Sequence, residues 1–439
     1  MNTMYLSIAP HDPIIARDGR PFGIGQGIRM RSLDWPYPSV LAGSLRTMLG
    51  KMNGGFSGEA VDKLLEDLLD IRIAGPLPLK NTQLYLPIPK DILAKEDCNK
   101  LEPIPLRPAN LRNGEACDFP NSRLIPPMIP ERDDDKDDYD FKPKKLPAFW
   151  SMKKMTEWLI NPSGIDFILC RDSKEKDDER DNKCDGKKRK ECWADDPDFL
   201  ESPEIDERVH TGIDAKTGAA AVEEGLLFMS AGLDLSTTES GGSIHLAARI
   251  EMDNTFEEMI GKLNEIHPFG GERRLAHWSK ANEPVGWRCP PEIPSKLKEL
   301  GSGKIRMVLA TPAIFSIGWM PGWLDSETLE GILPRLKDDK KFKLKLISAC
   351  TDRWRPISGW SAEAKSRGPK AIHRMVPAGS VYFFEAESAE AASDLAKSYW
   401  LESVCDEKQD RKDGFGLAVW GVWEEAKKAD KTDGNMDRR

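Results

Sequence analysis

The sequence predicts an α+β fold, because strand patterns and helical patterns follow one another along the chain. The alternating run from Met4 to Ile8 is typical of a strand. Apolar residues recur at helical spacing from Val40 to Leu49, where Ser39 or a neighbour would cap the helix and Gly50 would end it. The sequence of strands and helices is clearest in the last third of the chain.

The elements expected after this helix fall into two series. In the first half they are hairpin-like stretches at 71–79 and 83–88, a helix at 148–159, strands at 208–213, 225–234 and 243–250, and a helix at 255–265. In the C-terminal part they are a strand at 304–310, a helix at 324–336, strands at 342–349 and 380–385, a helix at 389–401 and a strand at 416–423.

The C-terminal series has the β-α-β-β-α-β order of a ferredoxin-like domain. We therefore predict two ferredoxin-like domains, one over 1–300 and one over 301–423. Long insertions interrupt the first, and about 100–205 is expected to be irregular and charged. Residues 424–439 balance acidic against basic side chains and are predicted to be a disordered tail.

Composition excludes several classes of protein. The 439 residues carry 64 Lys+Arg against 73 Asp+Glu, a net charge of −9, which fits a globular protein with solvated loops. The most apolar stretch, Met307–Ile317, is far shorter than the roughly 20 residues of a membrane span. His11, Asp12 and Arg17 fall where the apolar core of a secretory signal would lie, so we expect a cytoplasmic protein.

The eight cysteines form no C-x-x-C pair and are expected to be reduced thiols. The closest trio is Cys170, Cys184 and Cys192, and its spacing is too loose for a typical structural zinc site. We expect neither a metal nor a cofactor.

Charge is unevenly distributed along the chain. Residues 131–140 carry a net charge of −5, and residues 171–200 carry −2 with almost no apolar content. In contrast, ten Lys/Arg residues against Asp352 and Glu363 give residues 340–376 a net charge of +8. This polarised distribution fits a protein that presents one basic surface to an anionic partner.

A glycine-rich loop follows the first strand, with Arg17 and Arg20 at its start. Ile28 occupies the third-glycine position of G-x-G-x-x-G, so the dinucleotide fingerprint fails. Backbone N–H groups around Gly23, Gly25 and Gly27, together with the arginines, could still hold a phosphate chain. A flexible surface loop is an equally good interpretation.

The first helix places Gly43 and Arg46 on one face, since they are three residues apart. Glycine inside a helix costs about 1 kcal/mol, so Gly43 could permit close approach of an RNA phosphate beside Arg46 and near Ser39 at the helix N-terminus. Packing of the helix on a sheet is slightly favoured by the residues alone.

The segment after Gly270-Gly271 predicts a second contact with RNA. Arg273 and Arg274 would clamp phosphates, while His277 or Trp278 would stack on a base. A structural tryptophan is the commoner alternative for Trp278.

The basic segment 340–376, which we call the basic block, interleaves aromatic and basic side chains. This pattern is typical of proteins that bind single-stranded nucleic acid. Its candidate residues are Trp360, Lys370, His373 and Arg374. The turn Gly414-Phe415-Gly416 follows Arg411 and Lys412, and its alternative interpretation is a β-turn with a packed Phe.

No motif indicates an enzyme. The sequence lacks H-E-x-x-H, G-x-S-x-G and a Walker lysine motif. A metal-free ribonuclease would need a histidine as general base, and only His11 and His277 lie near the expected RNA-facing segments. We expect no catalysis.

Taken together, these segments resemble the RAMP superfamily of CRISPR proteins, and specifically the third subunit of Cmr-type (type III-B) effector complexes. The resemblance rests on R-D-G-R-P-F at 17–22, P-S-V-L-A-G-S-L-R at 38–46 and G-G-E-R-R at 270–274. It is supported by 209–214 with 225–228, by 368–384 and by G-F-G at 414–416.

The resemblance implies two ferredoxin-like (RRM-like) folds and a non-catalytic subunit. Such subunits bind the repeat-derived 5′ tag of the CRISPR RNA (crRNA), pair with the large polymerase/cyclase-like subunit and abut the first backbone subunit, so target RNA is an indirect partner. On this chain the loop at 17–27, Arg46, 271–274 and 414–416 would face the tag. The loops at 131–140 and 171–200 look like local insertions, which could be solvated or dock a partner.

Two alternatives remain open. The chain could be a RAMP endoribonuclease that processes precursor crRNA, with His11 or His277 as general base. It could also be a protein–protein bridge whose basic block binds an acidic partner.

Overall fold

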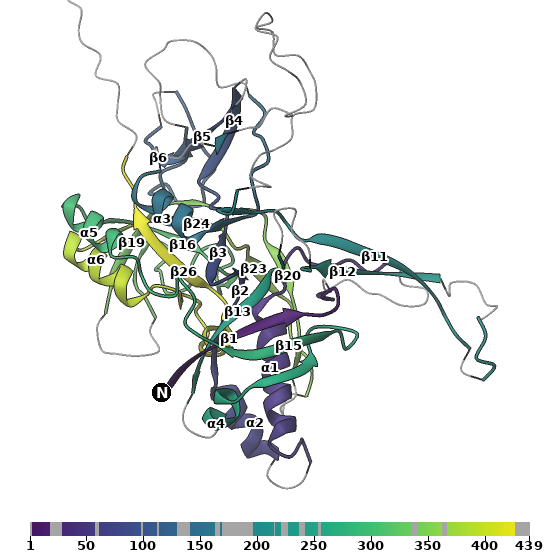
Figure 1. The fold of residues 1–439 in the computed structure, drawn as a ribbon. Coiled ribbons are helices and arrows are strands. Elements are labelled where there is room, and N and C mark those ends of the chain that lie inside the picture. The colour runs from purple at the N-terminus through teal and green to yellow at the C-terminus, as the bar shows by residue number, and fades with distance from the viewer. Residues whose placement is uncertain are drawn as a thin grey trace, which may run out of the picture.

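The computed structural model describes residues 2–17, 29–57, 61–97, 100–111, 114–129, 141–162, 167–168, 196–214, 216–220, 227–236, 242–252, 256–334, 341–361 and 367–425. The protein is a mixed α/β molecule. Its sheets are mostly antiparallel, and its described part contains few helices. Figure 1 shows the chain as two halves with a small insertion above them and a hairpin that projects to one side.

The first half is built on an eight-stranded sheet with the order β10-β8-β3-β2-β13-β1-β15-β14. Its elements are β1 (Asn2–Pro10), α1 (Pro38–Met52), α2 (Val61–Asp70), β2 (Arg72–Lys80), β3 (Gln83–Pro87), β8 (Phe149–Ser151), α3 (Met152–Ile160), β10 (Phe199–Leu200), β13 (His245–Met252), α4 (Glu257–Gly261), β14 (Asn264–Pro268) and β15 (Leu275–Ala281).

Alternation in β1 explains how this sheet forms its core. Leu6 and Ile8 are fully buried, whereas Ser7 between them points to the opposite face. Leu41 and Leu45 of α1 are also fully buried and belong to the same core cluster. The expected helix at 39–49 is therefore confirmed, with Pro38 in its first turn, but it does not end at Gly50 and continues to Met52.

The second half contains a six-stranded sheet with the order β18-β19-β24-β16-β26-β25. Its elements are α5 (Glu292–Glu299), β16 (Lys304–Leu309), β17 (Ala313–Ile314), β18 (Glu330–Ile332), β19 (Lys343–Cys350), β20 (Arg355–Ile357), β21 (Trp360–Ser361), β22 (Gly368–Pro369), β23 (His373–Val376), β24 (Val381–Ala386), α6 (Ala389–Ser398), β25 (Glu402–Ser403), α7 (Lys408–Asp413) and β26 (Leu417–Val422).

The two sheets share an order of central strands. In the first half β2-β13-β1-β15 lie side by side, and in the second half β19-β24-β16-β26 do. When these four strands are numbered in chain order within each half, each sheet arranges them as second, third, first and fourth. The two halves therefore repeat one pattern of strand pairing.

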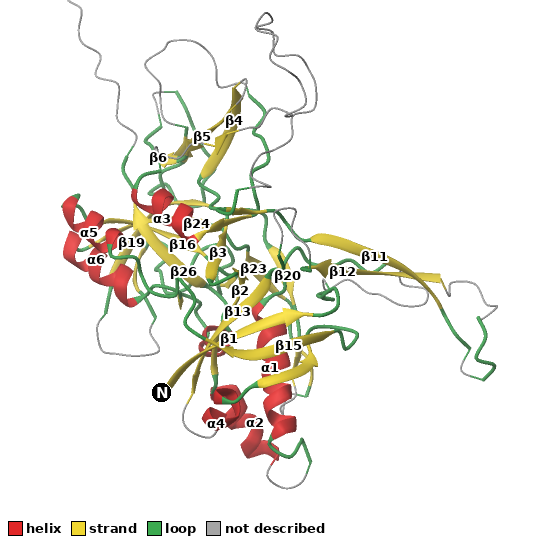
Figure 2. Ribbon diagram, in the orientation of Figure 1, coloured by secondary structure: helices red, strands yellow, loops and turns green. Residues whose placement is uncertain are grey.

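The helix predicted at 324–336 is wrong. Asp325 accepts hydrogen bonds from the N–H groups of Glu327 and Thr328 and so forms a turn, and Leu329 has a φ of +62°. The short strand β18 follows. Leu324, Leu329 and Leu333 are all buried, so the apolar residues of this segment belong to a packed loop. The helix on this side is instead α5, which precedes β16 and packs against α6 (Figure 2).

Two further parts extend from the halves. The insertion contains β4 (Ile92–Asp97), β5 (Lys100–Pro105), β6 (Arg107–Pro108), β7 (Pro127–Met128) and β9 (Phe167–Ile168). The projecting hairpin, which we call the arm, consists of β11 (Glu204–Thr211) and β12 (Leu227–Asp234) (Figure 1). The charged loops at 131–140 and 171–195 lie outside the described residues, as do 426–439 of the expected tail.

Candidate nucleic-acid interface

The ends of the glycine-rich loop meet at the edge of the first half. Arg17 forms an antiparallel bridge with Ser32 and is exposed. The predicted phosphate-binding residues Arg20, Gly23, Gly25 and Gly27 lie outside the described residues. The described ends of this loop therefore fix where it leaves and re-enters the fold.

The loop between β14 and β15 packs against the start of that glycine-rich loop. The N–H of Gly271 donates to the carbonyl of Ile15 at 2.7 Å, and Gly270 forms a parallel bridge with Ile15. A Cβ on Gly270 would lie 2.6 Å from the Ile15 carbonyl oxygen, and its φ is +78°. Only glycine permits this approach. Two of the predicted segments, distant in sequence, are thus brought together.

Two arginines extend from this loop. Arg273 is exposed and has a φ of +53°, a conformation that a non-glycine residue adopts at an energetic cost of order 1 kcal/mol. Arg274 is half-buried, and its Nε is buried without a hydrogen-bond partner. Strained backbone of the kind found at Arg273 clusters at functional sites.

Helix α1 runs beside the loop, because the Ser44 hydroxyl accepts a hydrogen bond from the N–H of Gly270 at 3.4 Å. Gly43, the preceding residue, is exposed, and a Cβ there would meet nothing within 4 Å. Packing inside the chain therefore does not require this glycine. Ser39 lies one turn earlier and is half-buried at the start of the helix, which has no side-chain cap.

Arg46 has a structural role. Its guanidinium donates to the carbonyl oxygens of Leu68 at 2.9 Å and Ile71 at 3.1 Å, and to Asp413 of α7 at 2.6 Å. These bonds tie α1 to α7, so Arg46 holds the halves together and we omit it from the proposed interface.

Trp278 and His277 point in opposite directions from β15. Trp278 is fully buried and donates from Nε1 to the His267 carbonyl oxygen at 3.2 Å, so its ring cannot stack on a base. His277 lies on the other face, where its Nε2 is 2.6 Å from the Asn264 Oδ1. Its ring centroid is 6.5 Å from that of His11. Trp278 is therefore a structural tryptophan, which was the commoner of the two interpretations.

The turn Gly414-Phe415-Gly416 is buried between the halves. Phe415 is 2% exposed, and a Cβ on Gly414, whose φ is +94°, would lie 2.7 Å from the Ile73 carbonyl oxygen. The Thr311 hydroxyl donates to the Gly414 carbonyl oxygen at 2.8 Å. The turn therefore packs one half on the other, with a core Phe, and we omit it from the interface as well.

The described part of the predicted basic block, 353–361 and 367–376, pairs β20 with β23 and β21 with β22, and we call it the basic hairpin. Trp360 is 67% exposed, and Lys370, His373 and Arg374 are exposed as well. The Arg374 guanidinium lies 4.9 Å from the ring centroid of Trp354, a half-exposed aromatic that the sequence analysis missed. Its place between Arg353 and Arg355 was the available signal.

The basic hairpin is fastened to the first half by an ion pair. Arg355 lies 2.8 Å from Asp34, which precedes α1. Asp410 of α7 also faces this region: burial raises its pKa to about 6, and the nearby Asp413 carboxylate adds to the rise, while His373 and Lys370 oppose it. The cationic hairpin therefore lies near α1 and α7 at the junction of the halves.

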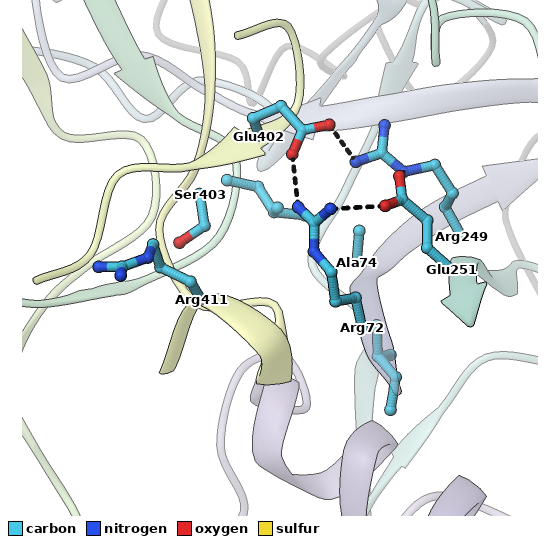
Figure 3. Close-up of a pocket in the computed structure, with 9 residues that line it drawn as sticks. Arg72, Ala74, Arg249, Glu251, Glu402, Ser403 and Arg411 are labelled. Atoms are coloured by element: carbon cyan, nitrogen blue, oxygen red, sulfur yellow. Dashed lines mark hydrogen bonds and ion pairs between the residues drawn. The ribbon is translucent and has the colours of Figure 1, made fainter. Parts of the chain in front are cut away.

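An ionic cluster at the junction was not expected from the sequence. Arg72 lies 2.6 Å from Glu251 and 3.0 Å from Glu402, and Arg249 lies 2.7 Å from Glu402 (Figure 3). The space that these side chains line with Arg411 is about 10 Å³, room for roughly one water molecule. The cluster joins β2 and β13 to β25 and is too small to hold a nucleotide.

Among the described residues, no group of His, Cys, Asp and Glu side chains is arranged to hold a metal ion. In the described part of the chain, no helix combines the length and the apolar character needed to cross a membrane.

Residues 6–423 match the family model described as CRISPR-associated protein (Cas_Cmr3). The chain belongs to the Cas_Cmr3 family. It is thus a Cmr-type CRISPR subunit, in agreement with the resemblance found in the sequence, and its role is that of a subunit of a type III-B effector complex. No curated protein matches the sequence.

Solved structures similar to this Cas_Cmr3 chain share little sequence with it. A chain of the type III-B Cmr-β complex bound to cognate target RNA and AMPPnP is 14% identical, with a TM-score of 0.41, 89% of this chain and 88% of that one being covered. A chain of a second Cmr-β structure, bound to cognate target RNA, is 15% identical, with a TM-score of 0.42 and 86% of each chain covered. A chain of the Csm3–Csm4 subcomplex of the type III-A CRISPR-Cas interference complex is 12% identical, with a TM-score of 0.35. That match covers 88% of this chain and 97% of the other.

Proposed function

We propose that this chain is a non-catalytic RNA-binding subunit that holds the repeat-derived 5′ tag of the crRNA. In this proposal it docks the large polymerase/cyclase-like subunit and abuts the first backbone subunit. The observation that carries the proposal is that the 270–274 loop contacts both Ile15, two residues before Arg17 and the glycine-rich loop, and Ser44, the neighbour of Gly43 in α1. Family membership supports the same role.

The chemistry of these segments suits an RNA backbone. Arg273 and Arg274 provide guanidinium groups for phosphate oxygens, and the open backbone at Gly43 leaves space for close approach. The basic hairpin adds cationic side chains and the exposed rings of Trp354 and Trp360, on which bases of a single strand can stack. A fixed tag would thereby be held in one register.

We also infer that both halves are ferredoxin-like units. The supporting observation is the shared strand order, second-third-first-fourth, which a β-α-β-β-α-β unit produces. In the second half, a loop replaces the first crossover helix.

Purification of the complex through a tag on this chain tests the proposal. We expect uniform repeat-derived 5′ ends in the co-purified RNA, and an Arg273→Ala/Arg274→Ala variant that retains roughly a tenth or less of that RNA, since each charge-assisted bond contributes about 1.5–3 kcal/mol. Arg288→Ala is the control, because this exposed arginine lies elsewhere and pairs with Glu283. Equal RNA retention in both variants would make the chain a protein adaptor.

One observation favours the alternative of an endoribonuclease. His11 and His277 face each other, and Asn264 orients His277. His245 lies near them: burial lowers its pKa, and the charge of His277 lowers it further. If this pair cleaves RNA, His11→Ala/His277→Ala will abolish cutting of precursor crRNA by the purified complex in EDTA, whereas His210→Ala will not. We expect no cutting by any of the three proteins.

A further inference from the structure

One carboxylate of α7 faces the basic hairpin without an ion pair of its own. Asp413 is held by the Arg46 guanidinium at 2.6 Å and by the Gln409 side-chain amide at 2.8 Å. Asp410, one turn earlier on the same helix, is half-buried and forms no ion pair within the described part of the chain. A partly buried carboxylate without a counter-ion is costly while it is ionised.

The backbone places the start of α7 beside the basic hairpin. Ile314 of β17 pairs with Met375 of β23, and its N–H donates to the Cys405 Sγ at 3.3 Å, just before α7. His373 lies two residues before Met375 on the same strand. Strand β17 therefore links β23 to the segment that leads into α7, and this link brings His373 near Asp410.

The charges that face Asp410 come from α7 and from the hairpin. Burial raises the pKa of Asp410 to about 6, and the carboxylates of Asp413 and Glu407 add to the rise. His373 and Lys370 of the hairpin oppose it, because a cation favours the ionised carboxylate. Asp410 therefore changes its charge just below neutral pH.

The other titratable groups around the start of α7 are engaged elsewhere or neutral. Lys412 and Lys408 face Asp70 of α2, and Arg411 donates to the Cys405 carbonyl oxygen at 2.7 Å. Burial raises the pKa of the Cys405 thiol, so this group stays uncharged. The hairpin therefore supplies the cations that stabilise the ionised form of the carboxylate it faces.

RNA on the hairpin would change this balance. Phosphates attract His373 and Lys370 away from Asp410, and they also repel its carboxylate. Both effects favour the protonated carboxyl group, which carries no charge. Because linkage is reciprocal, a ligand that favours the protonated form binds more tightly where that form is populated.

We propose that Asp410 makes RNA binding at the basic hairpin dependent on pH: its carboxylate opposes RNA while it is ionised and takes up a proton from solvent when RNA binds. The inference rests on the proposed function and adds regulation to it. Acidification below neutral pH then strengthens the hold of the hairpin on RNA.

Binding of RNA to the purified full-length chain tests the proposal. The probe is a fluorescent RNA with the 5′ sequence of the co-purified RNA, titrated at about pH 7.5 and about pH 5, on either side of the titration of Asp410. Asp410→Asn removes the charge at nearly constant shape. We expect it to bind about fourfold more tightly than wild type at the higher pH, an effect of one unit charge near a protein surface, and equally at the lower pH.

Two further variants identify the group that titrates. Glu407→Gln removes an exposed carboxylate from the same end of α7 and should give one affinity ratio to wild type at both pH values. In a His373→Gln background, Asp410→Asn should still strengthen binding at the higher pH, because the proton is taken up by the carboxyl group.

The outcomes separate this inference from tag binding. If the affinity ratio of Asp410→Asn to wild type does not change with pH, or if the effect disappears in the His373→Gln background, the inference is overturned while RNA binding stands. If wild type binds the RNA at neither pH, the proposed function falls together with it.

Discussion

Replacing Arg306 with methionine is expected to lower the free energy of unfolding by about 3–5 kcal/mol, because it leaves a buried carboxylate without its counter-ion. Arg306 is 1% exposed and Asp91 is fully buried, and the guanidinium bonds both to that carboxylate and to the Trp158 carbonyl oxygen. Burial lowers the pKa of Arg306, and the charge of Asp91 opposes that shift.

The location of this pair increases the effect. Trp158 of α3 donates from Nε1 to Asp91 at 3.0 Å, and Arg306 lies over the Trp158 ring at 5.4 Å. Arg306 belongs to β16, at the centre of the second half, whereas Asp91 and Trp158 come from the region after β3. One ion pair thus connects three segments that are distant in sequence.

Chemical denaturation of the purified chain measures this effect. The double variant Arg306→Met/Asp91→Leu removes both charges and is the control, since apolar replacement of a buried pair is often close to neutral. It is expected to be more stable than the single variant, although Trp158 Nε1 loses its acceptor. A loss below about 1 kcal/mol in the single variant would show that water reaches Asp91.

Substitutions of Gly43 are expected to change stability and RNA binding in opposite directions. Gly43→Ala should raise the free energy of unfolding by about 1 kcal/mol, because alanine is the better helix former and the position is open. Gly43→Leu should keep much of that gain but reduce the RNA retained by the complex about tenfold, because its side chain occupies the space that the proposed interface leaves for the RNA backbone.

Two measurements separate these effects. Thermal unfolding of the chain reports the stability, and the RNA content of complex purified through this subunit reports the binding. Ser295→Leu is the matched control, since it adds the same side chain at an exposed position of α5 in the other half. Full RNA retention by Gly43→Leu would mean that the glycine serves no contact with RNA.

Local signals predicted many single elements, misjudged one and missed others, such as α2, α5 and β15. The apolar spacing of 40–49 and the alternation of 4–8 each report a face that touches a core, so α1 and β1 were predictable. Leu329 and Leu333 are also four residues apart and buried, yet no helix forms there, because Asp325 accepts hydrogen bonds from the backbone N–H groups of a turn instead. The spacing of apolar residues indicates which side chains are buried, whereas the backbone hydrogen bonds decide whether a helix, a strand or a turn forms.

The candidate interface divides in the same way. Exposed members such as Arg273, Trp360 and Arg374 were found from residue type, because cationic and aromatic side chains in irregular segments have few structural uses. Arg46, Trp278 and Phe415 carry the same chemistry, but long-range partners fix them in the interior. No local pattern could distinguish the two groups, since those partners lie far away in the sequence.

The sequence by itself determined the family, the polarity of charge along the chain and the ordered set of glycine and arginine segments, because these are properties of residue type and order. The tertiary structure decided which segments meet. It placed the 270–274 loop on Ile15 and Ser44, and it closed the halves around Gly414. Such meetings depend on packing and hydrogen bonds between residues hundreds of positions apart, which only the folded chain brings within contact distance.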